Sequence, residues 1–126
     1  MTKESRQQAV TVIINVLKAI HQKEYQHILD CVDDSEENDI EMLFHFIQET
    51  LRLNGFGTID EYGIPCHFHP AYKYEQLRFY EFDDNSGFAA EYDLTSDSEL
   101  VDLCLQMKFL YQKSGLKSVF VTIDPQ

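Results

Sequence analysis

The stretch that decides the fold is LVDLCLQMKFLY, residues 100–111. From Val101 to Tyr111 every second residue is apolar or aromatic, and most of the residues between them are polar. Side chains alternate between two faces in a β-strand, whereas they recur every 3.6 residues in a helix. We therefore predict a long strand that buries one face. Cys104 falls on its polar side, where nothing basic adjoins it in the sequence to favour a thiolate.

Three further stretches have the same β-branched and aromatic character: Leu77–Asp83, Phe88–Leu94 and Leu116–Asp124. The segments between the four stretches, DNSG, TSDSE and QKSG, are rich in the residues of tight turns. Consecutive hairpins of this kind form an antiparallel meander. A long amphipathic sheet must bury one face against a second layer, and the N-terminal half of the chain has to supply that layer.

Helical periodicity dominates that half. The apolar residues predicted to face inward in the first helix, over residues 5–20, are Val10, Ile13, Ile14, Leu17 and Ile20. A short second helix is predicted within residues 21–32, with Tyr25, Ile28, Leu29 and Val32 on one face.

A third helix is predicted to begin with Asp34 or Ser35 as its N-cap and to end near Leu53, where Asn54-Gly55 supplies a left-handed stop. The acidic run DDSEEND, residues 33–39, suits a helix start; it lacks the central glycine and final glutamate of a calcium loop. We predict an α+β fold in a single domain, 1–126, with N-terminal helices (4–54) packed on a curved four-stranded antiparallel meander (56–124).

Composition narrows the class of protein. The chain has 126 residues, 44% of them hydrophobic, which is enough for one folded core. Its 10 basic and 22 acidic residues give a net charge of −12, which argues against nucleic acid as a partner. The sequence has neither a membrane-length apolar run nor the layout of a signal peptide, and its three cysteines lie far apart, so we expect a cytoplasmic protein.

The charge is also unevenly distributed. Nine carboxylates and no Lys or Arg lie between Lys23 and Arg52, and eight carboxylates with no Lys or Arg lie between Arg78 and Lys108. Such one-signed segments can steer a basic protein partner towards its binding site. They can equally serve solubility alone.

The segment VIINVLKAIHQKEYQHILDCVDD, residues 12–34, resembles the start of nuclear-transport-factor-like (cystatin-like) α+β cone proteins. Residues 91–109 are similar in rhythm to small bacterial cytosolic proteins, some of them immunity-type. The first resemblance implies a pocket between helices and sheet, and a homodimer formed through the sheet. That superfamily contains isomerase-like enzymes as well as non-catalytic binders, so the resemblance does not imply a particular chemistry.

The segment CHFHP, residues 66–70, could carry chemistry. In an extended segment His67 and His69 project to the same side, but zinc needs three or four ligands. His45, with Glu49 and Glu41 on the third helix, could complete such a site. Acid–base catalysis is an alternative, as is a polar strand edge on which Phe68 packs. We predict the last of these, with no metal and no cofactor.

Acid–base catalysis in a cone-type pocket would need a carboxyl group of raised pKa beside a hydrogen-bond donor such as tyrosine. The candidates in the sequence are Asp60, Glu61, Tyr62, Tyr80 and Tyr92.

Taken together, these patterns predict a non-catalytic cytoplasmic protein-binding module, in its most concrete form an acidic immunity-type inhibitor of a basic toxin. The predicted partner-binding residues are Asp33, Asp34, Glu36, Glu37, Asp83, Asp84, Glu91 and Asp93. The alternative is a small-ligand pocket protein, or a lyase- or isomerase-like enzyme of the cone fold, with His45, His67 or His69 near the opening. A third reading is a dimeric housekeeping domain whose acidic surface serves solubility.

Overall fold

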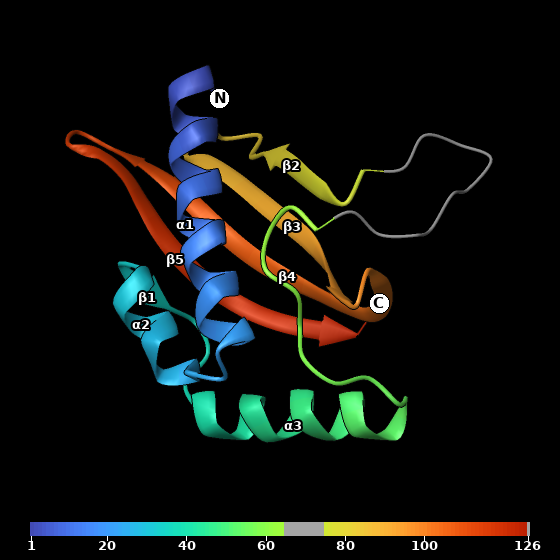
Figure 1. Cartoon of the computed structure of the whole chain (residues 1–126). Coiled ribbons are helices and arrows are strands. Elements are labelled where there is room, and N and C mark those ends of the chain that lie inside the picture. Colours follow the sequence, from blue (N-terminus) through green and yellow to red (C-terminus); the bar gives the residue numbers. More distant parts are fainter. Residues whose placement is uncertain (65–74, 126) are drawn as a thin grey trace.

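The computed structural model describes residues 1–64 and 75–125, and it shows an α+β fold in which helices cover one face of a curved five-stranded sheet (Figure 1). The elements in chain order are α1 (Lys3–His21), the 3₁₀ turn η1 (Tyr25–His27), α2 (Ile28–Cys31), β1 (Asp34–Ser35), α3 (Ile40–Leu53), β2 (Leu77–Glu81), β3 (Gly87–Ser96), β4 (Glu99–Gln112) and β5 (Gly115–Pro125). The predicted α+β class is confirmed. Within the described part of the chain, no helix is long and apolar enough to cross a membrane.

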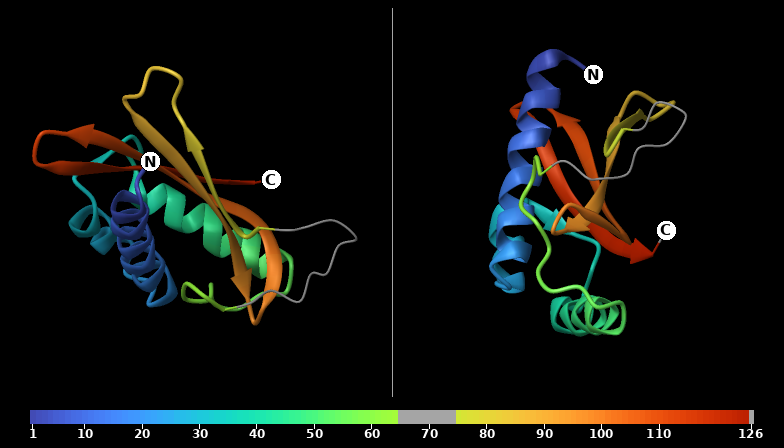
Figure 2. Two further views of the ribbon diagram at one scale, coloured as in Figure 1. Left: turned by 90° about the horizontal axis from the view of Figure 1, so that it is seen from above. Right: turned by 45° about the vertical axis from the view of Figure 1, so that its right-hand side comes forward.

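The strand order is β1-β5-β4-β3-β2. The pairs β2–β3, β3–β4 and β4–β5 are antiparallel, as the predicted meander requires. The fifth strand, β1, was not predicted: it pairs in parallel with β5. Figure 2 shows α1 on one side of the sheet and α3 across the end at which α1 finishes.

The N-cap predicted at Asp34 or Ser35 is wrong. The backbone around these residues bonds to β5 instead, with the Glu36 N–H donating to the Phe120 carbonyl at 2.8 Å. The cap of α3 is Asp39, whose carboxylate accepts from the Met42 N–H at 3.0 Å. Asp and Ser suit helix caps and tight turns alike, so the local pattern could not reveal a strand partner far along the chain.

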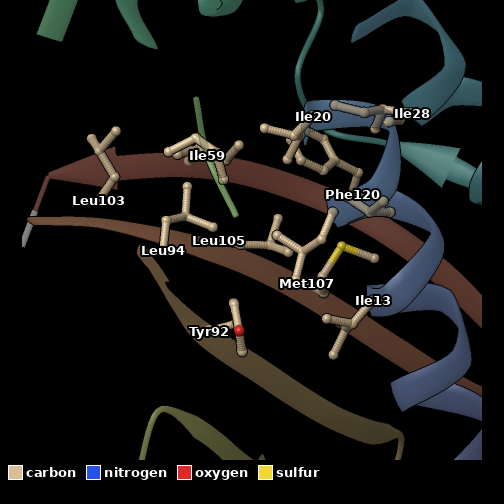
Figure 3. Packing of buried hydrophobic residues seen from close by; sticks show 14 of the residues in the cluster. Ile13, Ile20, Ile28, Ile59, Tyr92, Leu94, Leu103, Leu105, Met107 and Phe120 are labelled. Carbon is tan, nitrogen blue, oxygen red and sulfur yellow. The ribbon is translucent and has the colours of Figure 1, made fainter. Parts of the chain in front are cut away.

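The core lies between α1 and the sheet. Figure 3 shows Ile13 and Ile20 of α1 directed towards Met107 and Phe120 of the strands. All four are 1% exposed or less. Each buried Ile or Leu contributes about 1.5–3 kcal/mol relative to exposure, so this layer fixes the position of α1.

Two residues predicted to face inward do not. Ile14 is 41% exposed because the buried stripe of α1 runs through Ile13, Leu17 and Ile20 and a helix buries a limited arc. Leu29 is 44% exposed because α2 is a single turn, and its buried residue is Ile28.

The predicted strand over residues 100–111 is confirmed, with an irregularity near its start. Asp93 pairs with Cys104 while Thr95 pairs with Leu100, so β4 carries extra residues opposite Leu94. Asp102 takes the left-handed conformation (φ 59°) in this bulge. The bulge leaves Asp102 exposed and keeps Val101 and Leu103 both in the core.

The turn between β3 and β4 contains Asp97 at φ 49° and Ser98 at φ 66°. Two consecutive positive φ angles define a type I′ hairpin turn, whose second position favours glycine. We expect Ser98→Gly to raise the free energy of unfolding by up to about 1 kcal/mol, because glycine lacks the Cβ that strains this conformation. Denaturant unfolding would measure the gain.

The matched control is Ser114→Gly in the β4–β5 turn, where the serine φ is not positive. There glycine should be neutral or slightly destabilising because it adds freedom to the unfolded chain. Equal gains from both substitutions would contradict the turn assignment.

Candidate functional site

The sheet has a second face, opposite α1, which we call the outer face. On β3 the side chains of Phe88, Ala90 and Tyr92 enter the core, so Ala89 and Glu91 between them belong to the outer face. The register places Tyr80 beside Ala89, and it pairs Ala89 with Lys108 and Glu91 with Gln106. The outer face therefore gathers polar side chains from three strands.

This face contains a hollow of about 370 Å³, which we call the outer hollow. Its floor is set by Ala89, whose small side chain leaves room between larger neighbours. Tyr80 borders it with 48% of its surface exposed. The side chains around the hollow include Tyr80, Ala89, Glu91, Gln106, Lys108 and Val121.

Arg78 and Asp93 form a bidentate ion pair on the outer face. Two guanidinium nitrogens donate to the two Asp93 oxygens at 2.9 Å each, a bidentate arrangement. Asp93 holds the pKa of Arg78 above its usual value, and burial of the guanidinium opposes this. The Asp93 side chain is 5% exposed, so we remove it from the predicted partner-binding set.

Cys104 lies opposite Asp93 on the outer face, the polar side of its strand, and it is only 3% exposed there. A basic group does interact with it, because the Cys104 thiol and the Arg78 guanidinium are coupled electrostatically. The thiol also donates weakly to Glu91 Oε2 at 3.8 Å.

Lys108 is another cation of the outer face. Its Nζ lies 2.6 Å from Glu36 Oε2, and both side chains remain partly exposed. Arg78 and Lys108 are thus each held by a carboxylate other than Glu91. In the described part of the chain, no salt bridge involves Glu91, so its negative charge is not neutralised by a contacting cation.

The predicted acidic loop is largely engaged with β5. The Asp33 carboxylate accepts from the Ser118 N–H at 2.8 Å and from its hydroxyl at 3.2 Å, which indicates a structural role. Asp34 Oδ2 lies 3.7 Å from Lys117 Nζ, and Glu37 accepts from the Asp39 N–H. Asp34 and Glu36 remain at the margin of the sheet, on the β1 side.

Asp83 and Asp84 lie in the β2–β3 turn, beside a shallow hollow of about 490 Å³. The Ser86 hydroxyl and N–H both donate to Asp84, and these bonds lower the pKa of the Asp84 carboxyl. The nearby Glu81 contacts the N-terminal amine. The turn is exposed and acidic, at a distance along the sheet from the Asp34–Glu36 margin.

The enzyme candidates from the sequence have structural partners. The Asp60 carboxylate accepts from the Thr95 hydroxyl and from the N–H groups of Asp97 and Ser98, which ties the loop to the β3–β4 turn. Glu61 faces His21 at 3.7 Å. The rings of Tyr62 and Tyr92 lie 5.3 Å apart. The carboxyl groups of Asp60 and Glu61 contact the β3–β4 turn and His21 instead, so they do not form an acid–base site with these tyrosines.

A hollow of about 380 Å³ between η1 and α3 corresponds best to the alternative of a ligand pocket. Tyr25 and Phe44 line it, with ring centroids 4.5 Å apart. Burial raises the pKa of the Tyr25 phenol, and the hydrogen bond from Gln48 partly offsets this. The phenol therefore keeps its proton near neutral pH and offers no base.

His45 lines a neighbouring hollow of about 440 Å³, together with Glu49 and Arg52. Glu49 is held by Arg52, which lowers the pKa of its carboxyl. Among the described residues, no group of three or more His, Cys, Asp or Glu side chains is placed to hold a metal ion. His67 and His69 lie outside the described residues.

Several residues of the outer hollow were not predicted as a site: Ala89, Gln106, Lys108 and Val121. Alternation along β3 and β4 assigns Ala89, Gln106 and Lys108 to the outer face. Their positions opposite one another depend on the register, which the bulge at Asp102 shifts.

Residues 17–126 match the model of one protein family, described as a domain of unknown function (DUF7668). The match covers most of the chain. No curated protein and no solved structure matches the chain.

Proposed function

The chain belongs to this family of domains of unknown function, and we propose that it is a non-catalytic protein-binding module that docks a basic protein on the outer face of its sheet. The observation that carries the proposal is the charge arrangement around the outer hollow. The cations that the register places on this face, Arg78, Lys108 and Lys117, are paired with Asp93, Glu36 and Asp34 respectively. Glu91 therefore presents its negative charge beside the exposed Tyr80.

The net charge of −12 supports the proposal through its effect on association. An acidic surface attracts a basic partner over a distance of about 10 Å at ordinary salt and raises the rate of encounter. Asp34 and Glu36, at the sheet margin, are each paired with a lysine, so the long-range attraction comes from the excess of carboxylates over the whole chain. Exposed aromatic residues such as Tyr80 are common anchors of protein interfaces.

The most concrete form of this proposal is an immunity-type inhibitor of a basic toxin. Carboxylates can occupy a site that an enzyme uses for phosphate groups, so an acidic face suits the active site of a nuclease. The order of helices followed by a curved sheet supports the cone resemblance as part of the same proposal (Figure 1). The odd number of cysteines and their wide spacing in the sequence support a cytoplasmic location.

A comparison of face-specific variants tests the proposal. Ala89→Arg fills the outer hollow and adds one positive charge. Thr11→Arg, on the exposed side of α1, makes the same change of charge away from the outer face and serves as control. Each protein is immobilised after circular dichroism has shown that it is folded, and partners are captured from cell lysate.

We expect a basic protein that the wild type and Thr11→Arg retain and that Ala89→Arg releases. Its association rate with the wild type should fall at least tenfold between about 0.05 and 0.5 M salt. Retention of every captured protein by Ala89→Arg at the wild-type level would refute docking on the outer face.

A further inference from the structure

We propose that the outer hollow receives an arginine side chain of the partner, held between the Tyr80 ring and the Glu91 carboxylate. This inference rests on the proposed function, because it names the group that the outer face recognises. The register places Tyr80 next to Ala89, and Arg78 next to Glu91. Tyr80 and Glu91 are thus diagonal neighbours, within reach of one long side chain.

Tyr80 lies on the same side of β2 as Arg78, two residues further along the strand. It borders the hollow and contributes to the raised pKa of the Arg78 guanidinium. An aromatic ring at the side of a hollow can offer its face to a flat cation.

The charges of Glu91 and Lys108 indicate whether the group that enters the hollow is a cation or an anion. Among the described residues, Glu91 accepts one side-chain hydrogen bond, from the Cys104 thiol at 3.8 Å. A thiol is a weak donor. Lys108 is drawn to Glu36 at 2.6 Å. A positive group entering the hollow therefore meets a carboxylate that forms no salt bridge with any residue that the structure describes.

The side chains that line the hollow favour arginine over a metal ion or a lysine. One carboxylate and one phenol do not make a metal site, which needs several oxygen or nitrogen ligands. A guanidinium is planar, stacks on aromatic rings and pairs with a carboxylate through two parallel bonds. Its aliphatic stem can pack beside Val121 and over Ala89.

The test uses N-acetyl-arginine methylamide as probe and N-acetyl-glutamine methylamide as its neutral counterpart. Each is titrated into the ¹⁵N-labelled full chain, and the amide shifts are followed by NMR. We expect saturable shifts at residues 80, 89, 91 and 106 with the arginine probe and none with the glutamine probe. Glu91→Gln and Tyr80→Leu should each weaken binding about threefold to fivefold.

Asp30→Asn is the matched control, since it removes one exposed negative charge on α2, away from the outer face. It should leave the affinity of the probe unchanged. Equal binding by wild type and Glu91→Gln would overturn the inference. Shifts spread over the acidic surface in place of the hollow would overturn it as well.

Failure of this inference can be told apart from failure of the proposed function. If Ala89→Arg releases a basic protein but the arginine probe does not bind, the outer face is an interface and the arginine site is refuted. If the probe binds as expected but no captured protein distinguishes Ala89→Arg from the wild type, the arginine site stands and the protein-binding function is refuted.

Discussion

Replacing Arg78 by methionine should lower the free energy of unfolding by about 3 kcal/mol. The Asp93 side chain is 5% exposed and would lose the guanidinium that donates to both of its oxygens at 2.9 Å. Removing a bidentate cation from a buried carboxylate is costly because water cannot replace the lost charge there. Breaking a buried ion pair usually costs about 3–5 kcal/mol. We expect the lower end of that range because the Arg78 side chain is 26% exposed. Denaturant unfolding at neutral pH would measure it.

Two further variants make the result specific. Lys108→Met breaks the Lys108–Glu36 pair, whose side chains are 40% and 47% exposed, and should cost less than about 1 kcal/mol because water screens such a pair. The double variant Arg78→Met, Asp93→Leu should recover much of the loss, since it removes both buried charges. Similar losses for Arg78→Met and Lys108→Met would show that burial of Asp93 has little effect on stability.

Asp60→Ala should lower the free energy of unfolding by about 2–3 kcal/mol. The carboxylate accepts from the Thr95 hydroxyl at 2.8 Å, the Ser98 N–H at 2.9 Å and the Asp97 N–H at 3.1 Å. Thr95 is 1% exposed, so its hydroxyl would be left buried without this acceptor. The measurement is denaturant unfolding combined with hydrogen exchange at residues 97 and 98, whose protection should fall most.

Asp84→Ala is the control for this prediction. Asp84 also accepts two bonds within a hairpin turn, but that turn is exposed, so the expected loss is below about 1 kcal/mol. Asp60→Asn should fall between wild type and alanine, because one amide oxygen can still accept. If exchange at residues 97 and 98 were unchanged in Asp60→Ala, the loop would not be holding the turn.

The elements that the sequence predicts well are those with a strong local period. The alternation from Val101 to Phe109 and the turns between strands specify the meander, because strand pairing follows directly from short hairpins. The strand β1 could not be found this way. Two residues carry no measurable period, and their pairing with Val119 and Phe120 depends on how the whole chain closes.

The candidate site, too, could be predicted from the sequence only in part. Sequence identifies where carboxylates are abundant, and Glu36 and Glu91 do lie on or beside the outer face. It does not show which carboxylates are already held by cations. Arg78 reaches Asp93 because the register places it opposite Glu91, two residues before Asp93. A slip of β2 by one residue would turn Arg78 to the other face, away from Asp93.

The pairing of β1 with β5 has a consequence for the order in which the chain becomes structured. Asp33 and Ser118 exchange hydrogen bonds across 85 positions of sequence. A nascent chain can form α1 early, but β1 has no strand partner until β5 has left the ribosome. Contacts so distant in sequence slow folding, since a long loop must close before they form. We therefore expect the β2–β4 hairpins to form first and the pairing of β1 with β5 to form late.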